Sequence, residues 1–179
     1  MSWNFETEHF NVRLPVSDQD GEALYALLSQ NDAVAHIPRQ AMNIEAQALD
    51  ELRRIAMRFE SREAAFWLVE RKSDSKVVAR LGIQHINWMM LNSRFQWELD
   101  QECDLTVLQE VLPVVMTYLF NELHLHRLEM RLRAGDEKQT QLLKALGFSY
   151  EGTLPSVSEF EGQDVDLDIF SLLSGELLA

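Results

Sequence analysis

The side chains best placed to do chemistry lie around one junction between a strand and a helix. Glu98 stands near the end of a segment in which apolar and polar residues alternate, and a short loop follows it. Beyond the loop, apolar residues recur at three- and four-residue steps as far as Leu123, which predicts an amphipathic helix. Unpaired amides and the helix dipole favour a phosphate at such a junction. Glu98 is a candidate general base there, with an exposed strand carboxylate as the alternative.

The loop itself has an unusual composition for holding a phosphate. Glycine usually allows the backbone to approach a phosphate closely, and residues 99–110 contain none. Bulky and β-branched residues stand there instead, and they strongly disfavour positive φ. Asp104 adds a negative charge where an anion would sit. The sequence therefore combines a suitable architecture with an unsuitable loop.

The start of the helix after this loop can be read in two ways. Thr106 and Gln109 can form a capping box that starts the helix at about Val107, which places Pro113 in mid-helix and kinks it. Alternatively the helix starts near Glu110, and the loop is wider.

Composition limits the class of protein. The chain has 179 residues, of which 46% are hydrophobic and 25% charged, with a net charge of −13 and a single cysteine. The acidic balance argues against nucleic-acid binding, and no apolar run is long enough to span a membrane. The N-terminus does not resemble a secretory signal, so we expect a cytoplasmic protein. No Lys or Arg follows Lys144, so this acidic segment either attracts a cationic substrate or is a solvated face.

Periodicity indicates a mixed α/β sheet in one domain, residues 1–179. The expected strands span residues 9–16, 64–71, 77–88, 94–100, 127–133, 148–154 and 165–173. The other expected helices span about residues 18–30, capped by Ser17 or Asp18, then 44–62, and a short one from Asp136 to Ala145 that Gly147 ends. His124 and His126 lack a nearby third ligand, so no metal site is expected.

Four groups of residues match the sequence pattern of a known family. They are Trp88; Glu110, Val111 and Leu112; Tyr118, Phe120, Glu122, Leu123, Leu125, Arg127, Leu128 and Glu129; and Leu146, Gly147, Phe148, Glu151, Gly152 and Leu154. With these motifs the chain resembles the Rim-type branch of the GNAT N-acetyltransferases, ribosomal-protein N-terminal acetyltransferases among them, over nearly its whole length.

The resemblance implies a GNAT fold, with a mostly antiparallel central sheet flanked by helices and with its fourth and fifth strands, here residues 94–100 and 127–133, splayed apart. It implies an enzyme, monomer or homodimer, that transfers acetyl from acetyl-CoA to a cationic amine or a protein N-terminus, with Glu98 as base. Trp88, Trp97 and Glu159 would contact the substrate. The residues implied at the acetyl-CoA site are Leu99, Asp104, Leu105, Thr106, Val107, Leu108, Gln109, Asp136 and Gln139.

Departures from the family pattern keep a second interpretation open. The glycines and the basic residue of the pyrophosphate loop are absent, an asparagine that contacts CoA is replaced by Asp136, and a serine by Gln139. The acidic residue expected in the last hairpin falls on Ser158, next to Glu159. The alternative is a catalytically inactive GNAT-fold protein that has lost normal CoA binding and serves as a binding or regulatory module.

Overall fold

Eight strands form one continuous sheet in the order β1-β2-β3-β4-β5-β6-β8-β7. The computed structural model describes residues 2–178, apart from the side chains of residues 157 and 158. The strands are β1 (Phe5–Glu6), β2 (Phe10–Arg13), β3 (Ala64–Arg71), β4 (Val77–Asn87), β5 (Asn92–Leu99), β6 (Arg127–Arg133), β7 (Ser149–Phe160) and β8 (Gln163–Leu173). The helices are α1 (Gly21–Leu28), α2 (Asn31–Val34), α3 (Glu45–Glu60), α4 (Thr106–Asn121) and α5 (Glu137–Leu146).

Among the strands of residues 2–178, only β5 and β6 pair in parallel, and every other neighbouring pair is antiparallel. Helix α4 makes the crossover that a parallel pair requires. The expected mixed, mostly antiparallel sheet flanked by helices is therefore confirmed.

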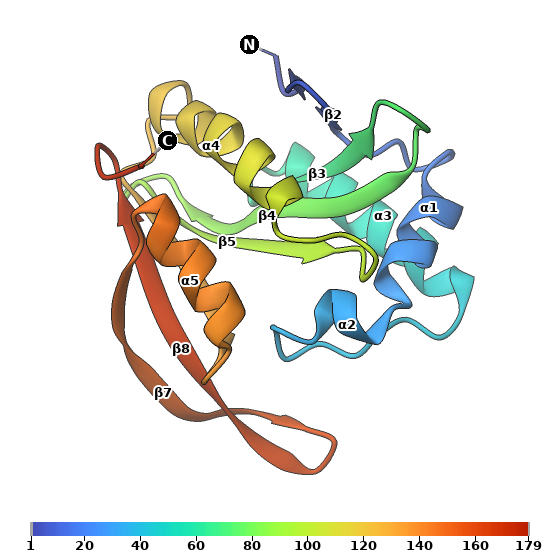
Figure 1. Cartoon of the computed structure of the whole chain (residues 1–179). Coiled ribbons are helices and arrows are strands. Elements are labelled where there is room, and N and C mark those ends of the chain that lie inside the picture. The colour runs from blue at the N-terminus through green and yellow to red at the C-terminus, as the bar shows by residue number, and fades with distance from the viewer. Residues whose placement is uncertain (1, 179) are drawn as a thin grey trace.

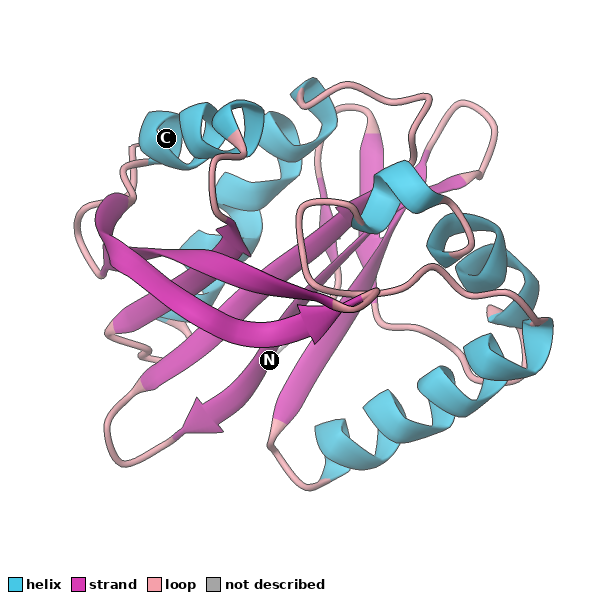
Figure 2. Cartoon of the chain, turned by 90° about the horizontal axis from the view of Figure 1, so that it is seen from below, coloured by secondary structure: helices cyan, strands magenta, loops and turns pink. Residues whose placement is uncertain are grey.

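Helices cover both faces of the sheet (Figures 1 and 2). Along β5, Phe95, Trp97 and Leu99 face the core that α4 and α5 cover. Along β3, alternate residues such as Phe66 and Leu68 face the other core, which α1, α2 and α3 cover. The alternation seen in the sequence thus sends side chains to two separate apolar layers.

Strands β7 and β8 form a long curved arm, drawn in orange-red and red in Figure 1. Both are longer than expected. Glu161 and Gly162 join them with φ angles of 52° and 78°, as a two-residue hairpin with a type I′ turn requires. Register shifts near Pro155 and Gly152 let β7 accommodate a proline, because β7 is an edge strand.

Several boundaries agree with the sequence. Strands β3 and β6 have the expected limits. Helix α5 follows Asp136, whose carboxylate accepts a hydrogen bond from the Gln139 amide at 3.1 Å, and it ends at Gly147 in the left-handed region with φ 102°. Helix α4 begins at Thr106, so the alternative start near Glu110 is wrong, and Pro113 lies inside the helix.

Other boundaries differ. The expected cap at Ser17 or Asp18 is wrong, because α1 begins at Gly21 after Asp20. The Asp20 carboxylate does not cap the helix, since it accepts two 2.8 Å hydrogen bonds from Arg13 and one of 2.6 Å from the Val16 amide.

Short elements were missed. Helix α2 lies within what was expected to be a loop, and β1 pairs with β2 near the N-terminus. Just before β1, the Trp3 ring stacks on Trp67, and the Trp67 indole donates to the Trp3 carbonyl oxygen. Among the described residues, no helix is both long and apolar enough to cross a membrane.

Candidate functional site

The sheet opens into a fork between β5 and β6. The two strands pair only from Asn92 with Arg127 to Phe95 with Met130, and they separate beyond that point. The Asp100 amide donates to the Val78 carbonyl oxygen on β4, and backbone groups alternate in direction along a strand. The backbone amide and carbonyl of Leu99 therefore face the fork, not β4.

His36, in the segment after α2, spans this fork. Its Nε2 lies 2.6 Å from the Trp97 carbonyl oxygen on β5, and its own carbonyl accepts a 2.9 Å hydrogen bond from the Arg133 amide on β6. A carbonyl can only accept, so Nε2 carries the proton and Nδ1 has the free lone pair. The residue is 4% exposed. Burial lowers the pKa of His36 below its usual value, which keeps the ring neutral.

Three of the predicted site residues meet on the α5 side of the fork. The Trp97 indole donates a 3.0 Å hydrogen bond to Gln139 Oε1, and Gln139 in turn donates its backbone amide to Asp136. Asp136 is the N-cap of α5. Asp136 and Gln139, two of the positions implied for CoA contact, therefore lie beside Trp97 at the fork, and the three residues are linked by hydrogen bonds.

The N-terminus of α4 carries a carboxylate of its own. Asp104 accepts a 2.9 Å hydrogen bond from the Thr106 amide and another from the Thr106 hydroxyl. These hydrogen bonds lower the pKa of Asp104, which stays ionised. Thr106 is therefore inside the helix and does not form the expected capping box with Gln109, whose amide donates to Leu105.

The backbone of this loop does not need glycine. Leu105 has φ −68°, and no residue from 99 to 110, all within the described part of the chain, has positive φ. The side chains of Val107 and Leu108 are buried in the core, whereas their amides, like that of Leu105, have no hydrogen-bond partner among the described residues. The loop therefore keeps free amides for an anion despite its bulky residues.

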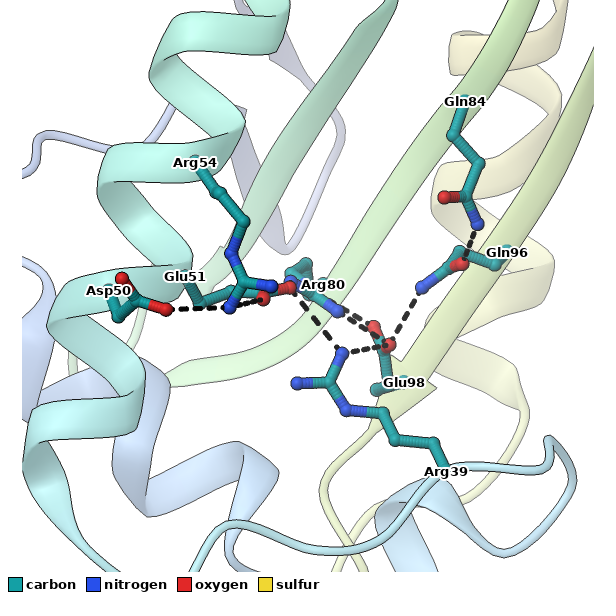
Figure 3. Close-up of polar contacts among 8 residues, drawn as sticks. All are labelled: Arg39, Asp50, Glu51, Arg54, Arg80, Gln84, Gln96 and Glu98. Atoms are coloured by element: carbon teal, nitrogen blue, oxygen red, sulfur yellow. Dashed lines mark hydrogen bonds and ion pairs between the residues drawn. The ribbon is translucent and has the colours of Figure 1, made fainter.

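Glu98 lies in a buried ion-pair network (Figure 3). Arg80 donates to both of its oxygens, at 2.9 and 2.7 Å, and Gln96 donates to one of them at 2.9 Å. Arg80 also bonds Glu51 at 2.8 Å, and Arg39 lies 3.9 Å from Glu98. Burial alone would raise the pKa of Glu98, but Arg80 outweighs burial and holds the pKa below its usual value.

This geometry gives Glu98 a structural role. The side chain is fully buried, and it lies on the sheet face opposite α4 and α5. An ionised carboxylate that is held by arginine on both oxygens is a weak proton acceptor. The role of Glu98 as a base stays a prediction.

The remaining predicted residues lie elsewhere. Trp88 does not reach the fork, because its indole donates to the Arg62 carbonyl oxygen and its ring packs under the Arg62 guanidinium at 4.6 Å. Glu159 is exposed on the β7–β8 arm, where it stands opposite Asp164 in the register of the two strands. The side chain of Ser158 lies outside the described residues. Among those that are described, no three His, Cys, Asp or Glu side chains are grouped to hold a metal ion.

Two residues with central contacts in this region, Arg80 and His36, were not predicted from the sequence. The burial of Arg80 could have been predicted from the sequence, because an arginine within the apolar run Val77–Ile83 needs a buried partner. No such pattern marks His36, because its role depends on Trp97 and Arg133, which are far away in the sequence.

Comparisons with known proteins agree with the fold and the fork. Residues 11–149 match the family described as "Acetyltransferase (GNAT) domain". The chain is 23% identical over 169 residues to the uncharacterized N-acetyltransferase YoaA of Bacillus subtilis (strain 168), covering 94% of this chain and 95% of that one.

Solved structures share the same fold. A ribosomal-protein-S5-alanine acetyltransferase from Vibrio fischeri superposes with a TM-score of 0.85 at 21% identity, covering 99% of this chain and 100% of that one. A spermidine N-acetyltransferase from Vibrio cholerae, in complex with CoA and spermine, superposes with a TM-score of 0.79 at 16% identity over 94% and 97% of the two chains. With the family match over residues 11–149, the splayed strands and the free amides at α4, this chain belongs to the GNAT acetyltransferase family.

Proposed function

We propose that the chain is an N-acetyltransferase that transfers an acetyl group from acetyl-CoA to a primary amine. The observation that carries the proposal is the fork between β5 and β6, which opens beside the free amides of Leu105, Val107 and Leu108 at the N-terminus of α4. These amides suit a diphosphate, and the fork suits the extended chain that links it to the thioester. The acceptor is a small amine or a protein N-terminus; the named neighbours are a ribosomal-protein-S5-alanine acetyltransferase and a spermidine N-acetyltransferase.

The reaction needs few groups from the protein. The amine nitrogen attacks the thioester carbonyl carbon, a C–N bond forms and the C–S bond breaks, and the proton lost by the amine ends on the CoA sulfur. The Leu99 amide, which faces the fork, is the donor that we assign to the carbonyl oxygen. We assign the removal of the amine proton to Nδ1 of His36, because its lone pair is free and Arg80 holds Glu98.

Titration calorimetry and mass spectrometry test this proposal together. We expect heat of binding with acetyl-CoA at concentrations up to about 1 mM, and one added acetyl group on at least one amine from a panel of peptides and polyamines. The absence of both heat and acetylation would refute it.

A second function is favoured by one observation. Asp104 places its own carboxylate at the N-terminus of α4, where it repels an anion. If acetyl-CoA does not bind, the chain is a binding module that has the GNAT fold but does not catalyse acetyl transfer.

Three further properties stay predictions: that residues 1–179 form a single domain, that the protein is cytoplasmic, and that it is a monomer or homodimer.

A further inference from the structure

A cavity of about 320 Å³ lies where β5 and β6 begin to separate. Gln96 of β5 and Arg131 of β6 line it, and the segment after α2 closes it with Ile37 and Arg39. Gln96 and Arg131 belong to the sheet face opposite α4 and α5, because their sequence neighbours Phe95, Trp97, Met130 and Leu132 all pack on the α4 side. A molecule in this cavity thus reaches the fork from the side away from the α4 amides.

The lining of this cavity is basic. Its described residues include Arg39, Arg94 and Arg131 and no acidic side chain. An adjoining cavity of about 230 Å³ shares Arg94 and Arg131, adds Arg127, and has Glu129 as its acidic residue. In a chain with net charge −13, this concentration of arginines is a marked local exception.

The local carboxylates do not satisfy all these guanidinium groups. Glu129 accepts a 2.6 Å hydrogen bond from Arg131, whereas Arg94 lies 3.8 Å from it, beyond hydrogen-bond distance. Arg127 pairs with Glu151 at 2.6 Å and also donates a 3.4 Å hydrogen bond to Glu129. Arg94 is therefore the cation of this group with the weakest ion pairing, and its side chain is 43% exposed. It is available for an incoming anion.

The pKa of His85, a neighbouring titratable residue, also reflects the positive charge of these arginines. His85, whose ring lines the adjoining cavity, has a pKa below its usual value, first because of burial and then because of Arg94, Arg58 and Arg131. Three arginines from α3, β5 and β6 thus act on one imidazole.

We propose that this arginine-lined cavity binds the amine acceptor, and that the acceptor carries a carboxylate close to its amine. The proposal rests on the acetyl transfer proposed above, and it specifies the substrate class. The carboxylate pairs with Arg94 and Arg131 while the amine points into the fork toward His36. A polyamine has no anionic group that could pair with these arginines, and its positive charges are repelled by them.

The acidic residues that suggested a cationic substrate lie elsewhere. Glu161, Asp164 and Asp166 line a different cavity, of about 460 Å³, on the β7–β8 arm. A cationic acceptor bound there would contact Arg133, which stacks on Phe160 with its guanidinium carbon 4.3 Å from the ring centre. The cavity at the base of the fork therefore selects for negative charge.

Matched acceptors test the proposal. The full-length protein is assayed with acetyl-CoA and two peptides of equal length that start with alanine, one continuing with Asp and Glu and the other with Lys and Arg. Spermidine and free aspartate complete the set. We expect kcat/KM for the acidic peptide or aspartate to exceed that for the basic peptide and spermidine at least tenfold. The choice between acidic peptide and aspartate identifies the source of the carboxylate.

Variants locate the effect. Arg94→Gln and Arg131→Gln should each lower kcat/KM for the preferred acceptor about tenfold, mainly through a higher KM, and should weaken its dependence on salt. Arg53→Gln, at an exposed position of α3 outside both cavities, is the control and should change neither. Preference for the basic peptide or spermidine overturns the proposal, as do variants that match the control.

Failure of the enzyme proposal can be recognised separately. If no amine is acetylated, calorimetry with the N-acetylated acidic peptide measures anion binding in the cavity independently of acetyl transfer. Binding that Arg94→Gln abolishes and Arg53→Gln preserves supports an anion site, and no binding by the unaltered protein overturns it.

Discussion

Replacing Glu98 with glutamine separates a structural carboxylate from a catalytic one. Glu98 and Arg80 are both fully buried, and Arg80 donates to both carboxylate oxygens at 2.7 to 2.9 Å. Glu98→Gln keeps the volume and removes the charge, which leaves Arg80 with Glu51 as its remaining carboxylate at 2.8 Å. Breaking a buried pair by removing one partner costs about 3 to 5 kcal/mol.

That cost is a large part of the stability of an ordinary domain, which is about 5 to 15 kcal/mol. For a chain of this length, each kcal/mol shifts Tm by roughly 2 to 4 °C, so Glu98→Gln should lower Tm by about 6 to 20 °C. Thermal and urea unfolding followed by circular dichroism measure the loss. Arg80→Met and the double variant complete a cycle, and the double variant should lose clearly less than the sum of the single losses.

One result would refute this reasoning. If Glu98→Gln unfolds within about 2 °C of the unaltered protein and still loses acetyl transfer, the carboxylate is not held by Arg80 in the way described, and Glu98 is the base after all.

Two further predictions concern the fork. Asp104→Asn should bind acetyl-CoA several-fold more tightly, because the asparagine side-chain oxygen can still accept from the Thr106 amide while the repelling charge is gone; calorimetry with Glu102→Gln as control checks this, and an unchanged Kd contradicts it. His36 should make stability depend on pH, because its folded pKa is depressed: its contribution is fully present above the unfolded pKa of about 6.5 and is lost as pH falls from there through the folded pKa. Urea unfolding from pH 7 to pH 5 should show stability falling faster than in His36→Gln, by at most about 1.4 kcal/mol per pH unit, and parallel curves would disprove it.

Local patterns were enough to predict most of the fold. Strands β3 and β6 follow from uninterrupted strand patterns, and Asp136 and Gly147 mark the ends of α5 because capping depends on neighbours in sequence. The start of α1 could not be predicted, because Arg13 takes the Asp20 carboxylate from across a turn. Helix α2, with four residues, is too short to show a period.

The candidate site was less predictable than the fold, because its contacts join residues that are far apart in the sequence. The family resemblance implied a substrate contact for Trp97 and acetyl-CoA contacts for Asp136 and Gln139, and the structure brings these three residues together. The sequence suggested Glu98 as a base because the alternation of apolar and polar residues does not reveal which side chain pairs with a strand carboxylate. Arg80, a charged residue within an apolar run, nevertheless indicated that a buried carboxylate partner was needed. His36 stayed hidden because its two contacts cross 61 and 97 positions of the chain.

The packing of Trp97 makes the fork optically visible. Its indole is hydrogen-bonded to Gln139, its carbonyl oxygen is bonded to His36, and its ring lies stacked 6.3 Å from the imidazole. Trp88 lies away from the fork beside Arg62, and Trp67 lies on the same face of the sheet as Trp97 but two strands away, on β3, where it stacks on Trp3. Of the four tryptophans, Trp97 is thus the one whose intrinsic emission offers a label-free signal of whatever enters between the two diverging strands.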